Sequence, residues 1–344
     1  MKKAVILFNL GGPDKLESVK PFLFNLFNDP AILNLPTFLR YPLAKLISNR
    51  RTPIAKKIYE ELGGSSPILK LTKDQSIALE KRLNQNEKNE EYKCFIVMRC
   101  WHPRAEEVIE NVKLYNPDEI ILMPLYPQYS AATSGSSIKE WNDVCKKNNY
   151  KIKTSTICCY PTDENFINAH TKEINKKIKD LKNFKLIFSA HGLPEKNIKK
   201  GDPYQWQVEQ SVNKIIENLN YHNLDWILSY QSRVGPLKWI GPSTDNTIIE
   251  NSKIGKHIVL VPIAFVSEHS ETLVELDIEY KKLAMDNGCK QYTRIPALGT
   301  NEDFIKSMSE LIIKKDEYKF NDYLYPPKIK CPSHLKKCPC LNYE

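Results

Sequence analysis

Short, almost uninterrupted apolar runs constrain the fold of this chain more than any other feature of its sequence. They are expected to be strands, at residues 3–8, 93–98, 119–123, 152–157, 184–189, 225–230, 257–262 and about 290–295. The stretches between them carry apolar residues at helical spacing, at residues 104–115, 134–147, 163–179, 204–219, 270–286 and 302–316. Strands without polar alternation are buried on both faces, which happens when helices cover both sides of a parallel sheet. The pattern therefore predicts an α/β fold.

The expected strands form two successive groups of four, and this grouping predicts two lobes. A chain of 344 residues is long for a single hydrophobic core. We expect two Rossmann-like lobes, each a doubly wound parallel sheet, with a cleft between them. The N-terminal lobe is assigned to residues 1–160, the C-terminal lobe to residues 161–317, and a Cys-rich tail without periodicity to residues 318–344.

Composition is that of an ordinary globular protein, with 41% hydrophobic and 26% charged residues. The net charge of +9 allows an anionic ligand or surface, but the basic residues are spread along the chain and predict no nucleic-acid site. No run approaches the roughly 18 uninterrupted apolar residues of a membrane span. Nine cysteines in a chain without an export signal indicate reduced thiols or metal ligands, so a cytoplasmic protein is expected.

Clusters of unusual residues follow nearly every expected strand. In parallel sheets, ligands bind outside the carboxyl ends of the strands, and these clusters share that edge. They are FNLGGP (8–13), MRCWHP (98–103), LYPQYSAATSGSS (125–137), SAHGLP (189–194), YQSRVGPLKWIGPST (230–244) and AFVSEHSETLVELDIEY (264–280).

These loops do not match nucleotide or hydrolase motifs. GGP at residues 11–13 lacks the second half of G-x-G-x-x-G, and no G-x-x-x-x-G-K-[ST] occurs, so no nucleotide is expected. Ser189 and His191 share one strand end, but no G-x-S-x-G elbow accompanies them. The leucines and aromatic residues of the loops instead favour a large, flat, apolar ligand with polar ends.

On these motifs the sequence resembles the ferrochelatase family. The matching stretches run in the family's order from about residue 4 to residue 315, and they are LFNLGGPDKLESVKPFLFNLF, RRTP (50–53), GGSSPI, LYPQYSAATSGSS, FSAHGLP, GDPY, QSRVGPLKWIGPST and FVSEHSETLVELDIEY. The resemblance implies an enzyme that inserts Fe²⁺ into protoporphyrin IX with release of two protons, the last step of haem biosynthesis. It also implies two Rossmann-like lobes that bind no nucleotide.

His191 is the first catalytic candidate. An imidazole titrates near neutral pH and can also ligate divalent iron. The structural alternative is a packed polar residue at the end of a buried strand. The resemblance makes His191 the histidine of the substrate cleft, and it leaves open whether the ring accepts a porphyrin proton or holds iron.

An acidic row is the second candidate, formed by Glu268, Glu271, Glu275 and Glu279. Spacings of three and four residues place all four on one face of a helix. Like charges at that spacing cost roughly 0.2–0.5 kcal/mol per pair, which argues against a merely solvated face. The row is expected to carry protons outward or iron inward, and the resemblance makes Glu271 the partner of His191 at iron.

The pocket walls are expected to come from both lobes. Arg99, Ser130 and Gln231 are candidates for holding the porphyrin propionates, because arginine binds carboxylates through two parallel hydrogen bonds. Candidates for packing against the ring faces are Leu10, Tyr126 and Trp239. The alternative for each aromatic residue is a place in the core.

Residues 31–51 form an apolar stretch interspersed with Arg40, Lys45, Arg50 and Arg51. The stretch is too charged to span a bilayer, but it suits a lip that lies on an anionic membrane surface. The alternative is an ordinary helical hairpin that closes the pocket. Because porphyrin is poorly soluble in water, peripheral membrane association is a further expectation for this cytoplasmic protein.

Cys331, Cys338 and Cys340 form a C-x6-C-x-C pattern in the tail. Three thiolates are one fewer than Fe–S clusters and structural zinc sites use. Some ferrochelatases carry a [2Fe-2S] cluster, and the chain resembles a bacterial version with this tail and a mid-chain cysteine. The resemblance implies Cys158 as the fourth ligand, with Cys159 as the alternative. Zinc is the rival occupant.

Two other functions remain open. A sibling chelatase would act on a different tetrapyrrole or on cobalt, although the GLP and QSRVGPLKW contexts favour ferrochelatase. A haem-binding sensor would keep the fold without turnover, but it would not need both His191 and Glu271. The tail and the lip favour protoporphyrin over coproporphyrin, and the chain is expected to be a monomer or a homodimer.

Overall fold

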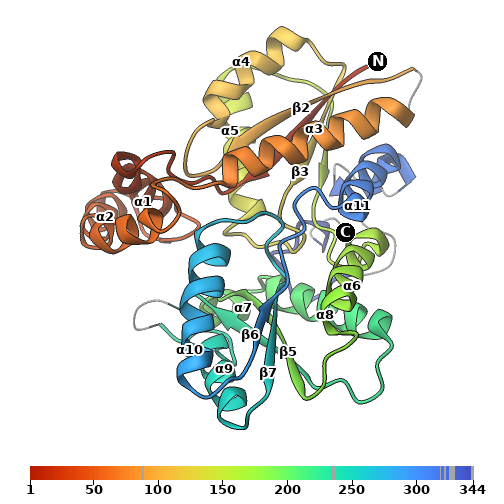
Figure 1. Cartoon of the computed structure of the whole chain (residues 1–344). Helices are drawn as coiled ribbons and strands as arrows, with labels where there is room; N and C mark the ends of the chain where they lie inside the picture. Colours follow the sequence, from red (N-terminus) through yellow and green to blue (C-terminus); the bar gives the residue numbers. More distant parts are fainter. Residues whose placement is uncertain (87–88, 234–236, 318, 321–322, 325–329, 342–344) are drawn as a thin grey trace. The chain divides into compact units, whose positions relative to one another are not determined.

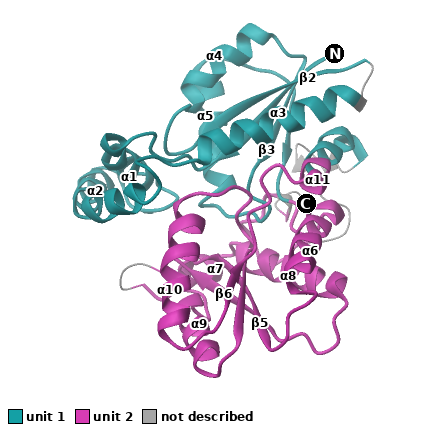
Figure 2. Ribbon diagram, viewed as in Figure 1, with its two compact units in different colours: residues 1–159, 308–325 teal, residues 160–307, 326–344 magenta. Residues whose placement is uncertain are grey.

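The computed structural model describes residues 1–86, 89–233, 237–317, 319–320, 323–324 and 330–341. The chain divides into two compact units (Figure 2). Unit 1 consists of residues 1–159 and 308–325, and unit 2 consists of residues 160–307 and 326–344. Each unit is built around its own sheet.

The sheet of unit 1 has four parallel strands in the order β2-β1-β3-β4, extended by two short strands, β10 and β9. The strands are β1 (Lys2–Asn9), β2 (Glu91–Met98), β3 (Glu119–Pro124), β4 (Thr154–Ile157), β9 (Lys319–Phe320) and β10 (Tyr323–Leu324). Alternate residues of β1, including Ile6 and Phe8, pack against α4 (Ala105–Tyr115) and α5 (Ser134–Lys147). Figure 1 shows α3 (Ile68–Asn86) crossing the opposite face of the sheet.

A helical pair precedes α3 in unit 1. The 3₁₀ turn η1 (Leu16–Ser18) leads into α1 (Val19–Phe27), which packs against the long helix α2 (Thr37–Glu60). Their shared core contains Phe22, Leu23 and Tyr59. The segment expected to be a lip, residues 31–51, is therefore largely the first part of α2.

The sheet of unit 2 repeats this topology with parallel strands in the order β6-β5-β7-β8. They are β5 (Phe184–His191), β6 (Trp226–Gln231), β7 (His257–Pro262) and β8 (Tyr292–Arg294). The helices of this half of the chain are α6 (Glu164–Ile178), α7 (Glu195–Lys199), α8 (Tyr204–Leu219), α9 (Thr244–Lys253), the π-helix η2 (Glu271–Glu279), α10 (Tyr280–Asp286) and α11 (Glu302–Ile313). Two 3₁₀ turns follow along the chain, η3 (Lys315–Glu317) and η4 (Pro339–Leu341).

The expected α/β fold with two doubly wound halves is confirmed. Each half has the strand order 2-1-3-4, which is one of the two common orders of doubly wound sheets, although no sequence repeat connects the halves. All eight expected strands and all six expected helical segments are present, with ends shifted by a few residues. The segment expected to be one regular helix at 270–286 begins instead as the π-helix η2.

The division of the chain differs from the expected lobes after residue 307. Residues 308–317, which were expected in the second lobe, belong to unit 1. The tail was expected to lack periodic structure, but β10 pairs with β4 and β9 pairs with β10. Strands of two residues carry no sequence periodicity, so only their pairing with a longer strand reveals them.

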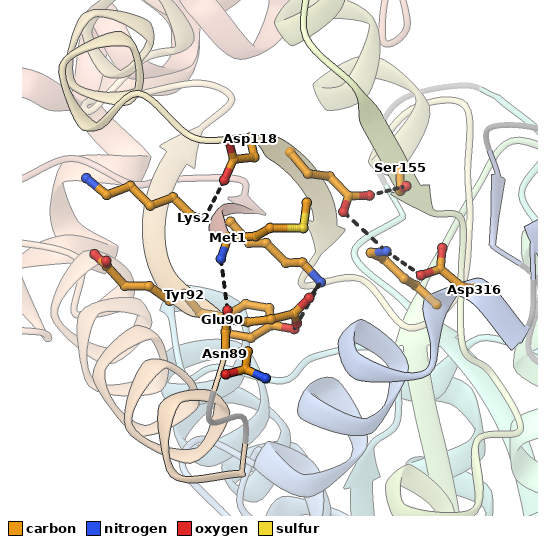
Figure 3. Close-up of polar contacts among 12 residues, drawn as sticks. Met1, Lys2, Asn89, Glu90, Tyr92, Asp118, Ser155 and Asp316 are labelled. Carbon is orange, nitrogen blue, oxygen red and sulfur yellow. Dashed lines mark hydrogen bonds and ion pairs between the residues drawn. The ribbon is translucent and has the colours of Figure 1, made fainter.

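Buried ion pairs hold the returning chain to unit 1 at the start of its strands (Figure 3). The ammonium of Lys315 lies 3.2 Å from Glu119, and both side chains are 1% exposed. Ser155 at β4 donates a hydrogen bond of 3.0 Å to the same carboxylate. Glu90 pairs with Lys3 on β1. A buried charge is tolerated only when it is paired, so the contact between Lys315 and Glu119 fixes the chain just after α11.

Candidate active site

The carboxyl edge of the sheet in unit 2 has one favoured place for a ligand. In a doubly wound sheet, a crevice forms where the connections from two neighbouring strands run to opposite sides. That point lies between β5 and β7, because β6 is on one side of β5 and β8 is on the far side of β7. β5 ends at His191, and the loop after β7 leads to Glu271 at the start of η2.

Glu271 is placed between two imidazoles. Its Oε1 lies 3.8 Å from Nε2 of His191, and its Oε2 lies 3.8 Å from Nε2 of His269. Burial lowers the pKa of His269, so that ring is neutral at pH 7. His191 and Glu271 stay partly exposed. The sequence predicted the pair of His191 and Glu271, and the fold brings the two side chains together.

The ring of His191 has a defined orientation. Nδ1 lies 2.7 Å from the carbonyl oxygen of Gly192. A carbonyl can only accept a hydrogen bond, so Nδ1 carries the proton in this contact. In the neutral ring, Nε2 then has a free electron pair, and this is the atom that faces Glu271.

The four carboxylates of the expected acidic row have different surroundings. Glu268 lies before the π-helix, and its Oε1 accepts hydrogen bonds from Arg294 at 2.6 Å and from the amide of Ala297 at 2.9 Å. The expectation that Glu268 shares a helix face with the others is therefore wrong. Glu279 is exposed at the far end of η2. A π-helix is rare and often marks a functional site.

Glu275 receives more hydrogen bonds than the other three carboxylates. Its Oε1 accepts from the Ser232 amide at 3.0 Å and from the Tyr280 hydroxyl at 3.1 Å. Its Oε2 accepts from the Ser232 hydroxyl at 2.6 Å and from Gln231 at 3.2 Å. Burial and the negative charge of Glu271 raise the pKa of Glu275.

Two expected porphyrin contacts lie at the same strand ends. Gln231 ends β6 beside His191, but its amide is buried between Glu275 and Ser189. Trp239 packs on Gly192, where an added Cβ would come within 3.3 Å of Trp239 Cε3. Nε1 of Trp239 is buried without a hydrogen-bond partner among the described residues, so it can donate to a ligand.

The other expected porphyrin contacts belong to unit 1. Leu10 follows β1, while Tyr126 and Ser130 follow β3, so they occupy the corresponding switch point of that sheet. The hydroxyl of Ser130 accepts a hydrogen bond from the amide of Ala132 at 3.1 Å. Burial raises the pKa of Tyr126, which keeps its phenol neutral.

Arg99 is already engaged within unit 1. Its guanidinium lies 2.9 Å from Asp29 and 3.0 Å from Glu140, and its Nε donates to Ser136 at 2.7 Å. The sequence predicted that the guanidinium of Arg99 binds a porphyrin propionate. In the structure this guanidinium already binds two carboxylates of the protein. A propionate would have to displace Asp29 or Glu140.

A family model of the ferrochelatases matches residues 2–316. The chain belongs to the ferrochelatase family. It is 84% identical to the ferrochelatase of Pelagibacter ubique (strain HTCC1062) over 344 residues, which is 100% of each chain. It is 51% identical to the ferrochelatase of Rickettsia bellii (strain OSU 85-389) over 342 residues, 98% of this chain and 95% of the relative.

A solved chelatase has the same fold. SirB from Bacillus subtilis, determined with Fe³⁺, matches 93% of this chain and 99% of its own with a TM-score of 0.56. The sequence identity is 12%, so this likeness concerns the fold alone. The family match ends at residue 316, and the Cys-rich tail lies beyond it.

Sequence reasoning missed His269, Ser232 and Tyr280 as members of the site. His269 had a usable signal, because it lies two residues before Glu271 in the same motif. The sequence carries no signal for Ser232 and Tyr280, since a serine after a strand and a tyrosine on a helix are common. Their role depends on where the carboxylate of Glu275 points.

Two cysteines of the tail, Cys331 and Cys338, are buried in unit 2. Cys331 is 4% exposed and Cys338 is 0% exposed. Gln207 on α8 donates to Sγ of Cys331 at 3.4 Å. The side chain of Cys340 lies outside the described residues. Cys158 and Cys159 are buried directly after β4 in unit 1. Within the described part of the chain, no group of three metal-ligating side chains is present.

Proposed function

We propose that the chain inserts Fe²⁺ into protoporphyrin IX, releases two protons and so completes haem synthesis, with His191 and Glu271 as its catalytic residues. The observation that carries the residue assignment is the 3.8 Å approach of His191 Nε2 to Glu271 Oε1 at the switch point of unit 2. At this edge of the sheet, the basic nitrogen of His191 supplies a proton acceptor, and the carboxylate of Glu271 attracts a cation.

The reaction needs a group that takes the pyrrole protons and a route that removes them. Nε2 of His191 has the free electron pair, and it serves either as the proton acceptor or as an iron ligand. Glu271 beside it stabilises a protonated imidazole and draws iron toward the ring. Glu275 and Glu279 follow along η2 and continue the route toward solvent, whereas Glu268 is committed to Arg294.

The open geometry of this pair suits iron as a substrate. A metal held by a complete set of short ligand bonds is released slowly, whereas iron must pass from the protein to four pyrrole nitrogens. Among the described residues, no three side chains form a closed metal site. His191 and Glu271 supply only two ligands, which is an incomplete coordination shell. The pair therefore supports a transient iron position.

Porphyrin binding is assigned to the residues at the two switch points. Trp239 offers a ring face and an N–H group that has no partner within the described ranges, and Leu10 and Tyr126 offer apolar walls. We assign the propionates to Ser130, and to Gln231 where a propionate displaces Glu275 or Ser189 from its amide. Arg99 joins them if one of its internal carboxylate partners gives way.

We further propose that the tail carries a [2Fe-2S] cluster bound by Cys331, Cys338, Cys340 and Cys158, with Cys159 as the alternative to Cys158. When bound, such a cluster supplies a structural cross-link between distant parts of the chain. Thiol donors fit iron and sulfide, and the N–H···S contact from Gln207 suits a thiolate at Cys331.

The backbone around the tail also fits a fixed position for these cysteines. The amide of Lys337 donates to the carbonyl of Gly201 at 3.0 Å. Gly201 has a φ of +88°, and a Cβ there would come within 2.8 Å of the Lys336 nitrogen. Only glycine permits this close approach, and the contact supports a fixed position of the tail segment 330–341 on unit 2.

We also propose that the first half of α2 lies on an anionic membrane surface. Phe38 is 75% exposed, and Leu39 and Tyr41 are also exposed next to Arg40 and Lys45. Apolar side chains beside basic ones suit the boundary between lipid headgroups and acyl chains. No helix in the described ranges combines the length and hydropathy that a transmembrane span requires.

The function is tested by anaerobic metal insertion, followed by the loss of porphyrin fluorescence. Protoporphyrin IX is compared with coproporphyrin, and Fe²⁺ with Co²⁺. We expect many turnovers and the highest kcat/KM for Fe²⁺ with protoporphyrin IX. His191→Ala is expected to fold and to lose this activity, whereas the exposed His222→Ala variant keeps it. Haem binding without turnover would instead support a sensor, and a preference for Co²⁺ would support a sibling chelatase.

A further inference from the structure

Three buried hydroxyl groups in unit 2, here called the hydroxyl chain, have no role in the function proposed above. They are Ser189 on β5, Ser229 on β6 and Thr244 at the start of α9, and each residue is 0% exposed. Thr244 Oγ1 lies 2.9 Å from both Ser189 Oγ and Ser229 Oγ. At one end, Ser229 Oγ donates to the carbonyl of Phe188 at 3.1 Å.

The other end of the hydroxyl chain reaches Glu275 through one side-chain amide. Ser189 Oγ donates to Oε1 of Gln231 at 2.7 Å, and Nε2 of Gln231 donates to Oε2 of Glu275 at 3.2 Å. Gln231 is 1% exposed, so water cannot readily replace either partner. The orientation of this amide therefore decides whether Glu275 faces a donor or an acceptor.

In this orientation the hydroxyl chain has too few protons. Among the described residues it makes four contacts, one to the Phe188 carbonyl, two between its own members and one to Gln231. Three hydroxyls supply three protons, and Ser189 and Ser229 use theirs at the two ends. Thr244 can then donate to only one neighbour, so one contact joins two oxygens without a proton between them.

A half-turn of the Gln231 amide removes this defect. Nε2 then donates to Ser189, and each hydroxyl donates to the next until the last reaches the Phe188 carbonyl. Oε1 of Gln231 now faces Glu275, and it has a donor only if that carboxyl carries a proton. Complete hydrogen bonding of the hydroxyl chain and protonation of Glu275 therefore occur together.

Some of the charged and titratable groups around Glu275 favour its protonated form, and others favour its anion. Burial and the charge of Glu271 on the same helix favour the protonated carboxyl, while His191 on β5 favours the anion. The hydroxyls of Ser232 and of Tyr280 on α10 can donate to the anion or accept from the acid. Neighbouring carboxylates tend to separate into one acid and one anion.

We propose that Thr244 and Ser229 are positioning residues that turn the Gln231 amide oxygen toward Glu275 and thereby keep this carboxyl protonated. The negative charge of the carboxylate pair then stays on Glu271, beside His191. The inference rests on the proposed function only for the use of that charge, which is to attract Fe²⁺. The network itself acts in the protein without substrates.

The test measures the protonation of Glu275 in protein without porphyrin or iron. Infrared titration of protein labelled with ¹³C-glutamate follows the carboxyl C=O bands, and Glu275→Gln identifies one band by its loss. Thr244→Val removes the central hydroxyl at similar volume, so that Ser189 can donate to Gln231 with no contact left unmet. We expect the pKa of Glu275 to fall by roughly 0.4–1 unit, the equivalent of one hydrogen bond.

Two variants complete the test. Thr244→Ser keeps the hydroxyl and is expected to titrate like the wild type. Ser229→Ala also frees a proton for the Gln231 oxygen, so it should lower the pKa of Glu275, and it serves if Thr244→Val does not fold. An unchanged or higher pKa in the folded valine and alanine variants would overturn the proposal. Wild-type iron insertion is assayed separately, so its absence would refute the proposed function alone.

Discussion

Nε2 of His191 lies 3.8 Å from Oε1 of Glu271; His191 ends β5, and Glu271 comes after the neighbouring parallel strand β7. The two residues are far apart in the sequence. The strand order places both at one edge of the sheet, and the proton on Nδ1 of His191 leaves Nε2 open toward the carboxylate.

Glu271→Gln is expected to lower kcat for iron insertion by roughly 10²-fold or more, because the amide keeps the size of the side chain but loses its charge. Glu250→Gln is the matched control, since Glu250 is exposed on α9 and has no role in the proposed route. Initial rates at saturating porphyrin give the comparison. Equal rates for the Glu271 variant and the wild type would remove this residue from the mechanism.

Cys338→Ser is expected to abolish the visible absorption of the purified protein and to lower its melting temperature. Both effects follow if a cluster ties the tail to a distant part of the chain. Cys145→Ser, at a half-buried thiol on α5, should leave colour and stability unchanged. Protein purified without oxygen that contains neither iron nor sulfide above background would contradict the cluster.

The double variant Phe38→Ser and Leu39→Ser is expected to reduce binding to anionic vesicles in a flotation assay. These two side chains are exposed next to basic residues, so their loss removes apolar area that would enter the lipid. Ile77→Ser is the control, because Ile77 is 68% exposed on a different helix, α3. If the wild type does not float with the vesicles at moderate salt, the membrane proposal fails.

Lys315→Met is expected to destabilise the protein by roughly 3 kcal/mol, because it leaves the buried carboxylate of Glu119 without its closest cation. Lys153→Met is the control. Lys153 lies 3.5 Å from the same carboxylate, but its side chain is 55% exposed, so a loss below about 1 kcal/mol is expected. Denaturant unfolding at pH 7 measures the stability of both variants. Similar losses of stability would contradict the conclusion that Lys315 is the main partner of Glu119.

His170 should make stability depend on pH. Burial lowers its pKa from 6.5 to about 3, and neither ring nitrogen has a hydrogen-bond partner among the described residues. The unfolded chain therefore binds a proton that the folded protein excludes, and stability is lost as the pH falls from 6.5 toward 3. As the pH falls through this window, the free energy of unfolding of the wild type should decrease by roughly 1.4 kcal/mol per pH unit relative to that of His170→Leu. A constant difference between pH 7 and pH 5 would contradict the prediction.

The sequence by itself determined the fold class and the edge of the sheet at which the candidate site residues lie. Continuous apolar runs of strand length, bounded by turn residues and alternating with amphipathic helices, favour buried parallel strands. The clusters after each strand then had to meet at the carboxyl edge of a sheet. His191 and the segment around Glu271 could be assigned to that edge without coordinates.

Only the tertiary structure decided what each polar side chain does there. Equal spacing made Glu268 and Glu275 look alike, yet one pairs with Arg294 and the other receives four hydrogen bonds. Arg99 has internal carboxylate partners, and Lys315 ties a distant helix end to Glu119. Local spacing sets the direction of a side chain, but its charge state and its role depend on partners that are remote in the sequence.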